Sequence, residues 1–210
     1  MLKYYLMTQK TNLIILIISL LLFSMITIGV VKHSEIIQNF DNQTASLISN
    51  IHFPTLDKMM LSITKICDTY EALLIFIVFA ILLIVKRKKT SFYVLTIATI
   101  LGTILPEVIK NLIGRIRPES LLLQEAGFSF PSGHATISVI FLISSIILLA
   151  PIIKNRLYKI IFIIVAVTIF SLVAFSRVYL SVHFASDVIA GIFLGILCFT
   201  LPSLIGFYNY

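Results

Sequence analysis

The sequence predicts an all-α membrane protein that crosses the bilayer six times, because it is too apolar and too poor in charge for a soluble domain. Of its 210 residues, 59% are hydrophobic and 12% are charged, whereas soluble domains contain roughly 45–50% and about 25%. The mean hydropathy is +1.08. These values exclude a soluble globular protein, a disordered chain and a disulfide scaffold, and the length suits a single domain over residues 1–210.

Several apolar runs along the chain are close in length to the roughly 20 residues that a membrane helix needs. The first, although preceded by lysines, is too long for a signal peptide and lacks an A-x-A-like cleavage site, so we expect it to be retained. The second has a short apolar part, so we expect it to begin near Ile66. The expected membrane helices cover residues 13–31, 72–85, 91–109, 135–153, 160–175 and 188–207.

The segment 32–71 is the least apolar part of the chain and contains a weakly amphipathic piece, residues 56–66, after Pro54. Such a pattern favours short helices lying at the membrane surface. Two further polar segments, 110–134 and 176–187, separate the later apolar runs. We expect both to be loops.

The distribution of charge predicts the orientation in the membrane, since short cytoplasmic loops collect Lys and Arg. With both termini in the cytoplasm, the inner side holds nine basic and no acidic residues, and the outer side holds seven basic and all nine acidic ones. The two polar loops then open together on the outer face. The net charge of +7 is explained by this topology and does not indicate nucleic-acid binding, which would require a basic water-soluble domain.

Neither a disulfide nor a metal site is indicated by the sequence. Cys67 and Cys198 are far apart and are expected to be isolated thiols in or near apolar helices. No cluster of carboxylates, His or Cys has the spacing of metal ligands. The sequence contains no feature that specifies an oligomeric state.

The first segment with the residues of a chemical site is Lys110 to Pro118. Lys110 ends an expected helix, and Arg117 precedes a proline, which disfavours helical backbone. Arg117 should therefore leave the helix and turn across the site. A lysine point charge and a bidentate guanidinium together suit a phosphate.

The second segment is Pro131-Ser132-Gly133-His134. A proline, a capping serine and a glycine before a helix expose backbone N–H groups, which bind anions. Gly133 allows an oxyanion to approach closely, and His134 is expected on the first turn. Alone, this tetrapeptide indicates only the start of a helix.

The third segment runs from Ser176 to Asp187. His183 and Asp187 are four residues apart, so a helix would place them on one face. A carboxylate bound to one imidazole nitrogen fixes the tautomer and leaves the other as a nucleophile or base. Arg177 lies off that face, so the chain must turn before His183.

Together, the segments predict an anion-binding pocket with two histidines, a carboxylate and several cations, suited to a phosphoryl transition state. An isolated Lys or Arg at a helix end usually extends to lipid headgroups, but several converging with histidines favour a functional site. The three motifs, Lys110-x6-Arg117-Pro118, Pro131–His134 and Ser176-Arg177-x5-His183-x3-Asp187, resemble the signature motifs of the type 2 phosphatidic acid phosphatase (PAP2) family.

The resemblance implies a PAP2-type helical bundle and a metal-independent phosphatase that needs no cofactor and forms a phosphohistidine intermediate. It assigns His183 as the nucleophile, Asp187 as its orienting partner and His134 as the acid that protonates the leaving oxygen. The phosphoryl oxygens would be bound by Lys110, Arg117 and Arg177, with hydrogen bonds from Ser132 and Gly133. Soluble vanadium haloperoxidases share this site, but six membrane spans argue against that branch.

The remaining polar residues carry weaker expectations. Arg115, within the spacer of the first motif, has no family role and is expected to contact headgroups or the rim of the site. Glu107 either pairs with Lys110 or is an interfacial acid. His33 and His52 are expected to be solvated. Tyr179 lies near the site, but anchoring at the membrane interface explains it equally well.

We therefore expect a lipid phosphatase of the cell membrane, acting at the outer face on a lipid whose tail stays in the bilayer. For a bacterial chain, which Ile/Lys-rich usage suggests, the resemblance favours undecaprenyl pyrophosphate, then phosphatidylglycerophosphate. Two alternatives remain open. A phosphotransferase would use the same phosphohistidine, whereas a non-hydrolytic lipid or anion carrier would not need a nucleophile.

Overall fold

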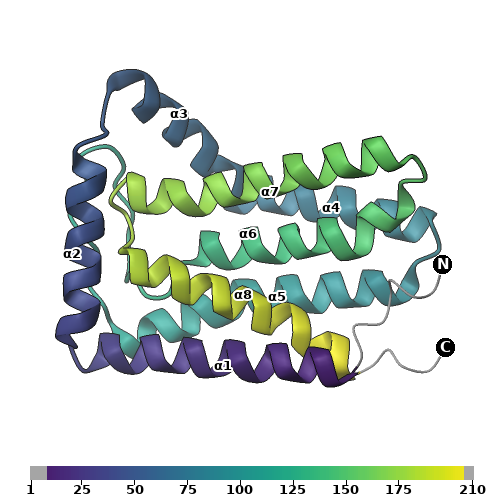
Figure 1. The fold of residues 1–210 in the computed structure, drawn as a ribbon, viewed down its shortest axis with the longest axis horizontal. Coiled ribbons are helices and arrows are strands. Elements are labelled where there is room, and N and C mark those ends of the chain that lie inside the picture. Colours follow the sequence, from purple (N-terminus) through teal and green to yellow (C-terminus); the bar gives the residue numbers. More distant parts are fainter. Residues whose placement is uncertain (1–8, 206–210) are drawn as a thin grey trace.

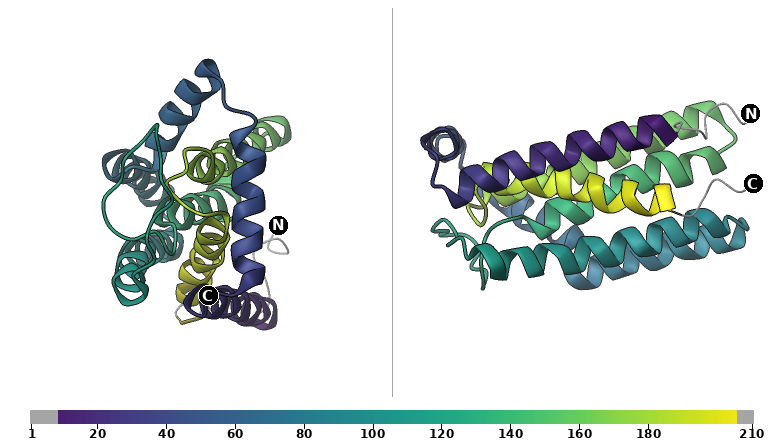
Figure 2. Two further views of the ribbon diagram at one scale, coloured as in Figure 1. Left: turned by 90° about the vertical axis from the view of Figure 1, so that its left-hand side faces the viewer. Right: turned by 90° about the horizontal axis from the view of Figure 1, so that it is seen from below.

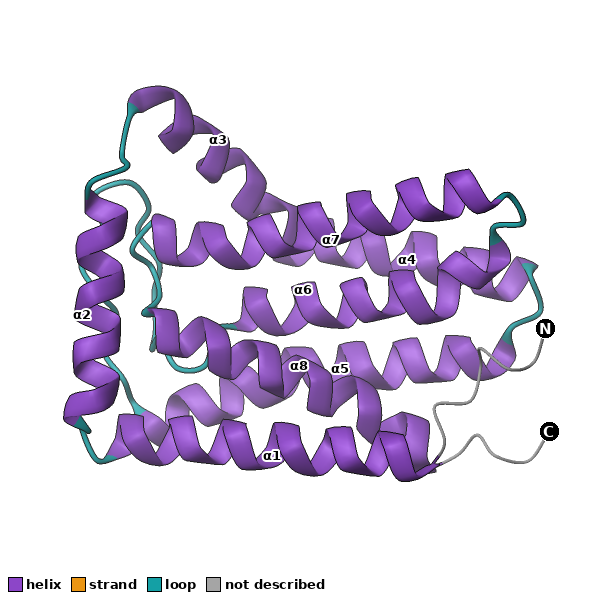
Figure 3. Ribbon diagram, in the orientation of Figure 1, coloured by secondary structure: helices purple, strands orange, loops and turns teal. Residues whose placement is uncertain are grey.

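The computed structural model describes residues 9–205, and all regular structure within them is helical (Figure 3). The helices, in chain order, are α1 (Gln9–Val31), α2 (Glu35–Ser49), α3 (Pro54–Thr64), η1 (Lys65–Cys67), α4 (Thr69–Val85), α5 (Lys89–Ile113), α6 (Gly133–Ile143), η2 (Ser144–Leu149), η3 (Ala150–Ile152), α7 (Arg156–Tyr179) and α8 (Ala185–Ile205).

The expected membrane helices are all present, with shifted ends. Five helical stretches of the described chain are long and apolar enough to span a bilayer, and a sixth is reached if α3–η1 and α4, which meet at 54°, count as one bent span. The second expected helix corresponds to α4, which has 17 residues. The last was expected to reach residue 207, and its end lies outside the described residues. The expected loop 176–187 is shorter than predicted, because α7 continues to Tyr179 and α8 begins at Ala185.

α6 and α8 form the centre of the bundle. Of the most apolar 18 residues in each span, 61% are buried in the span that begins with α6 and 56% in α8, compared with 11% in α1. α8 packs against α1, α5 and α6, and these helices run side by side in Figures 1 and 2. The outer helices therefore present their apolar side chains to lipid.

α2 lies across one end of this bundle, roughly perpendicular to the other helices, and α3 slants away from the same end (Figures 1 and 2). The first residues of α1 and the last of α8 lie at the opposite end. The segment expected to contain short surface helices thus forms α2 and α3. The two loops next to the sequence motifs, residues 114–132 and 180–184, lie at the end that α2 covers.

The close contact between α6 and α8 depends on glycines. A Cβ at Gly191 would lie 2.5 Å from the carbonyl oxygen of Ser132, and one at Gly195 would lie 2.6 Å from that of Thr136. Glycine at both positions lets the two backbones approach. As a result, the backbone N–H of Ser132 donates a hydrogen bond to the carbonyl oxygen of Asp187 at 3.0 Å, which joins the second motif to the third.

We expect Gly195→Ala to destabilise the protein by about 1–3 kcal/mol, the usual cost of overpacking, because the new methyl group would meet the Thr136 backbone. Cys67 and Cys198 are buried free thiols, so a thiol-reactive dye reports thermal unfolding of the detergent-purified protein. Leu201→Ala, at an exposed position of α8, is the matched control. Equal unfolding midpoints for the two variants would contradict the need for close approach.

Candidate active site

The first motif leaves α5 at a glycine. Gly114 has a φ of 67° and ends the helix in a left-handed conformation, its N–H bonded to the carbonyl oxygen of Lys110 at 2.9 Å. Arg117 therefore lies outside the helix, as expected. The helix ends at Gly114, however, and not because of Pro118. Lys110 stays on α5, where its Nζ lies 2.6 Å from Oε1 of Glu107.

Arg117 lies against the histidine of the third motif. Its Nη1 donates to the carbonyl oxygen of Val182 at 2.7 Å and lies 3.1 Å from Nε2 of His183. The same nitrogen lies 3.2 Å from Oε2 of Glu125. Burial lowers the pKa of the Arg117 guanidinium from its ordinary value, while Glu125 opposes this shift.

Arg177 occupies the last turn of α7 and is completely buried. Its Nη1 donates to Oγ1 of Thr64 at 2.5 Å, and its Nη2 donates to Oε1 of Glu125. Its Nε has no hydrogen-bond partner among the described residues. A desolvated guanidinium with one free donor is suited to bind an anion.

Glu125 joins the two arginines, a role that the sequence did not indicate. One carboxylate oxygen contacts Arg177 and the other contacts Arg117. Burial raises the pKa of this carboxyl group, but the charges of Arg177, His134 and Arg117 outweigh that effect and lower it overall. The guanidinium groups of two motifs thus converge on one pair of oxygens.

His183 and Asp187 are neighbours, as expected, but not through helical spacing. His183 lies in the loop before α8, and Asp187 lies in the first turn of that helix. The chain turns at Ser181, whose φ is 53°, as the position of Arg177 required. Nδ1 of His183 lies 3.6 Å from Oδ2 of Asp187, longer than a hydrogen bond, and that oxygen accepts from the N–H of Phe184 at 2.9 Å.

Arg115 was expected to contact headgroups or the rim of the site, and in the structure it pairs with two buried carboxylates. It donates through Nη1 to Oδ1 of Asp187 at 2.5 Å and through Nη2 to Oδ2 of Asp41 at 2.7 Å. Asp41, on α2, is buried and also accepts from the N–H and hydroxyl of Ser186 at 2.9 and 2.7 Å. Because Asp187 is fully buried, it needs such a cation.

The second motif begins α6 as predicted. Ser132 is the N-cap, and its hydroxyl oxygen accepts a hydrogen bond from the N–H of Ala135. A Cβ on Gly133 would meet only Pro106, at 3.9 Å, so the backbone there is open on one side. Nε2 of His134 lies 2.7 Å from Oδ1 of Asp68, an acid from before α4.

The expectation for Tyr179 changes, whereas His52 is an exposed loop residue as expected and gains a partner. Tyr179 is buried, and its hydroxyl donates to Oδ1 of Asp57 at 2.6 Å, so it does not anchor the membrane interface. Nδ1 of His52 lies 2.9 Å from the same oxygen, and its ring contacts that of Tyr179 at 4.4 Å between centroids. These contacts fix α3 against α7 beside Arg177.

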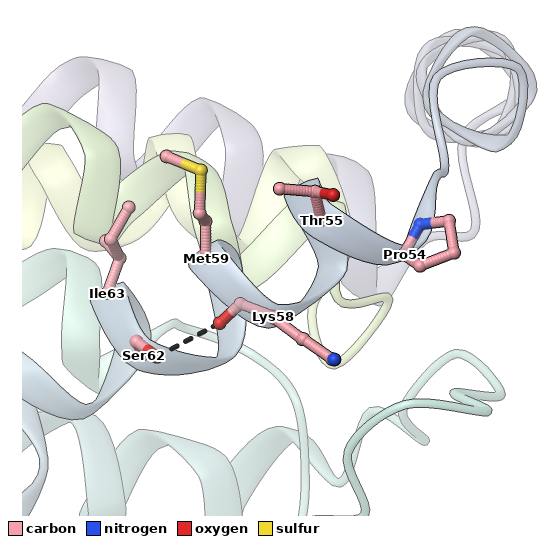
Figure 4. A pocket seen from close by; sticks show the side chains of 6 residues that line it. All are labelled: Pro54, Thr55, Lys58, Met59, Ser62 and Ile63. Atoms are coloured by element: carbon pink, nitrogen blue, oxygen red, sulfur yellow. Dashed lines mark hydrogen bonds between the residues drawn. The ribbon is translucent and has the colours of Figure 1, made fainter.

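A hollow on the exposed side of α3 lies apart from these residues (Figure 4). It is lined by Pro54, Thr55, Lys58, Met59, Ser62 and Ile63. None of them belongs to the three motifs, so the hollow is separate from the anion site. Within residues 9–205, no group of three or more His, Cys, Asp and Glu side chains could hold a metal ion.

The comparisons with known proteins all point to one family. The family model described as the PAP2 superfamily matches residues 90–210. The chain is 31% identical over 192 residues to phosphatidylglycerophosphatase B of Bacillus subtilis, covering 88% of this chain and 91% of that protein. It is 33% identical over 163 residues to an undecaprenyl-diphosphatase of Sulfolobus acidocaldarius, covering 74% and 73%.

Two solved structures are similar in fold. A transmembrane PAP2-type phosphatidylglycerolphosphate phosphatase from Bacillus subtilis superposes with a TM-score of 0.76 at 27% identity, covering 92% of this chain and 98% of that one. LpxE of Aquifex aeolicus has a TM-score of 0.58 at 23% identity, covering 77% and 93%. The latter likeness concerns the fold alone.

Arg115→Gln is expected to lower the free energy of unfolding by about 2 kcal/mol, because it removes charged hydrogen bonds to two buried carboxylates. Thermal unfolding followed with the thiol-reactive dye measures this loss. Combination with Asp41→Asn should cost less than the sum of the single changes, since the two side chains share one network. Lys58→Gln, on the exposed side of α3, is the control. Equal midpoints for the Arg115 and Lys58 variants would restore the headgroup interpretation.

Burial lowers the pKa of His183 from 6.5 to about 4, while Asp187 acts in the opposite direction. The ring is therefore expected to be neutral in the folded protein at neutral pH. Below pH 6.5 the unfolded chain binds a proton here that the folded protein does not, so stability falls as the pH drops toward 4.

The protonation of His183 can be followed by ¹⁵N NMR on protein labelled at its four histidines. The His183 signals are identified by their loss in His183→Asn. Titration with a midpoint far below 6.5 is the expected result. A midpoint at 6.5 or above would contradict a desolvated ring.

Proposed function

The chain belongs to the PAP2 superfamily and is a membrane lipid phosphatase of that type, and we propose that it hydrolyses a lipid mono- or diphosphate through a phosphohistidine on His183. One observation carries this proposal. Arg117 and Arg177 converge on a single pair of carboxylate oxygens, those of Glu125, beside Nε2 of His183. A phosphoryl group presents oxygens of the same charge, and bound there it would lie next to the nucleophile.

The proposed reaction uses these residues in two steps. Nε2 of His183 attacks the phosphorus, and the bond from phosphorus to the leaving oxygen breaks. His134 donates a proton to that oxygen. Water then attacks the phosphohistidine, gives a proton to His134 and releases phosphate. Asp187 orients His183 from the Nδ1 side and stabilises the positive charge that the ring gains.

The phosphoryl oxygens would be held by the two guanidinium groups and by backbone N–H groups at the start of α6. Ser132 caps that helix and Gly133 is its first residue, and the positive end of the helix favours an anion. Lys110 adds positive charge nearby, although its nearest partner is Glu107. The neutral state of buried His183 suits a nucleophile, because a protonated ring could not attack.

Two lipids are the leading substrate candidates, undecaprenyl pyrophosphate and phosphatidylglycerophosphate. The names of the similar proteins include both. A site at the end of a bundle with exposed apolar sides suits a substrate whose tail remains in the bilayer. The excess of basic residues at the opposite end supports an outward-facing site under the positive-inside rule.

The test is phosphate release by the detergent-purified protein in the presence of EDTA, with undecaprenyl pyrophosphate, phosphatidylglycerophosphate and phosphatidic acid. Release should persist with EDTA and fall at least 10³-fold in His183→Ala, because loss of a nucleophile removes most of the catalysis. Lys58→Gln, outside the site, should match the wild type. The relative rates rank the substrates.

The alternative functions give different results in the same assay. A carrier would release no phosphate and would tolerate His183→Ala. A phosphotransferase would form a phosphorylated product when a candidate acceptor is added, at the expense of free phosphate. Release unaffected by the His183 substitution would contradict the phosphohistidine mechanism.

A further inference from the structure

Asp68 lies at an unusual place in the fold, between η1 and α4, where the chain bends by 54°. It occupies the N-cap position of α4, with extended backbone. An aspartate at an N-cap normally accepts hydrogen bonds from the first N–H groups of its own helix. Asp68 makes no such bond.

The carboxylate of Asp68 reaches α6 instead. Its Oδ1 lies 2.7 Å from Nε2 of His134, 66 positions further along the chain. The neighbouring residue, Cys67, is buried and accepts a hydrogen bond from the hydroxyl of Ser138, one turn after His134. Two adjacent residues at the bend are thus fixed against one face of α6.

We propose that Asp68 is the positioning residue of His134 in the phosphatase reaction. This inference rests on the proposed function, and it concerns the proton that the leaving group receives. An ionised carboxylate only accepts hydrogen bonds, so the imidazole donates from Nε2. The nitrogen left to face the substrate is therefore Nδ1.

The proton balance explains why the acid needs this partner. To donate from Nδ1 while Nε2 is bonded to Asp68, the ring must hold both protons and carry a positive charge. The carboxylate neutralises that charge. When phosphorus transfers to His183, the Nδ1 proton moves to the leaving oxygen and His134 becomes neutral. The same nitrogen then takes a proton from the attacking water, which restores the charged pair.

Substrates with different leaving groups distinguish a positioning role of Asp68 from a merely structural link between α4 and α6. An alkoxide, as released from dioctanoyl phosphatidic acid, needs a proton as it departs. A 4-nitrophenolate is stable without one. A residue that positions the acid therefore affects the first substrate far more than the second, whereas a structural defect lowers both equally.

The experiment compares kcat/KM for dioctanoyl phosphatidic acid and 4-nitrophenyl phosphate, measured on the full chain in detergent. Asp68→Asn should lower the value for the alkyl phosphate by about 10²-fold, within the range of general acid catalysis, and the value for the aryl phosphate less than threefold. Asp68→Glu, which keeps the charge, should recover part of the loss. Glu71→Gln, an exposed acid in the first turn of α4, is the matched control and should change neither value.

The double variant Asp68→Asn/His134→Ala adds a second criterion. If Asp68 acts through His134, the double variant should be no slower on the alkyl phosphate than His134→Ala alone. Equal losses on the two substrates, an additive double variant, or no loss in Asp68→Asn would each overturn the proposal. The thiol-dye unfolding midpoint identifies any variant that fails to fold, in which case Asp68→Glu decides between the outcomes by the same ratio.

Failure of the proposed function would look different. Wild-type protein that releases phosphate from neither substrate would contradict the phosphatase mechanism itself, and with it the role of Asp68. Wild-type activity together with an unselective Asp68→Asn would leave the mechanism in place and reject only the positioning role.

Discussion

Neutralisation of charge at the end of an apolar bundle is the constraint on which the site depends. Isolated charges cannot be buried without a large cost, yet the third motif places Arg177 and Asp187 in the fully buried core. Each is paired with an opposite charge from elsewhere in the chain, Arg177 with Glu125 and Asp187 with Arg115. The motifs are therefore stable only when these distant segments are in place.

This constraint accounts for the position of the surface helices. α2 crosses the end of the bundle (Figure 1), and its buried Asp41 contacts Arg115 and Ser186. α3 contributes Thr64, whose hydroxyl accepts a hydrogen bond from Arg177. Both helices are built into the site by polar contacts and do not simply rest at an interface. The bend after α3 brings Asp68 to His134.

The sequence was sufficient to predict the helices and the motif residues, because apolar runs and motif spacing are local signals. It could not predict the distant acids that pair with them, Asp41, Asp68 and Glu125. Arg115 and Asp41 are 74 positions apart, and Asp68 and His134 are 66 apart, so no periodicity links them. Arg115 was misjudged because its position has no role in the family motif, although Arg115 is the cation that pairs with the buried Asp187.

The two His–Asp pairs differ in a way that matches two chemical roles. His183 is almost fully buried and is held neutral, and its Nδ1 lies 3.6 Å from Asp187, which also accepts from Arg115. Burial is the main reason that the pKa of His183 is lowered, so the ring is expected to stay unprotonated until it gains phosphorus. Asp68 is hydrogen-bonded to His134, with 2.7 Å between Oδ1 and Nε2. The hydrogen bond from His134 to Asp68 supplies the direct carboxylate partner that an acid uses, whereas Nδ1 of His183 lies 3.6 Å from its carboxylate.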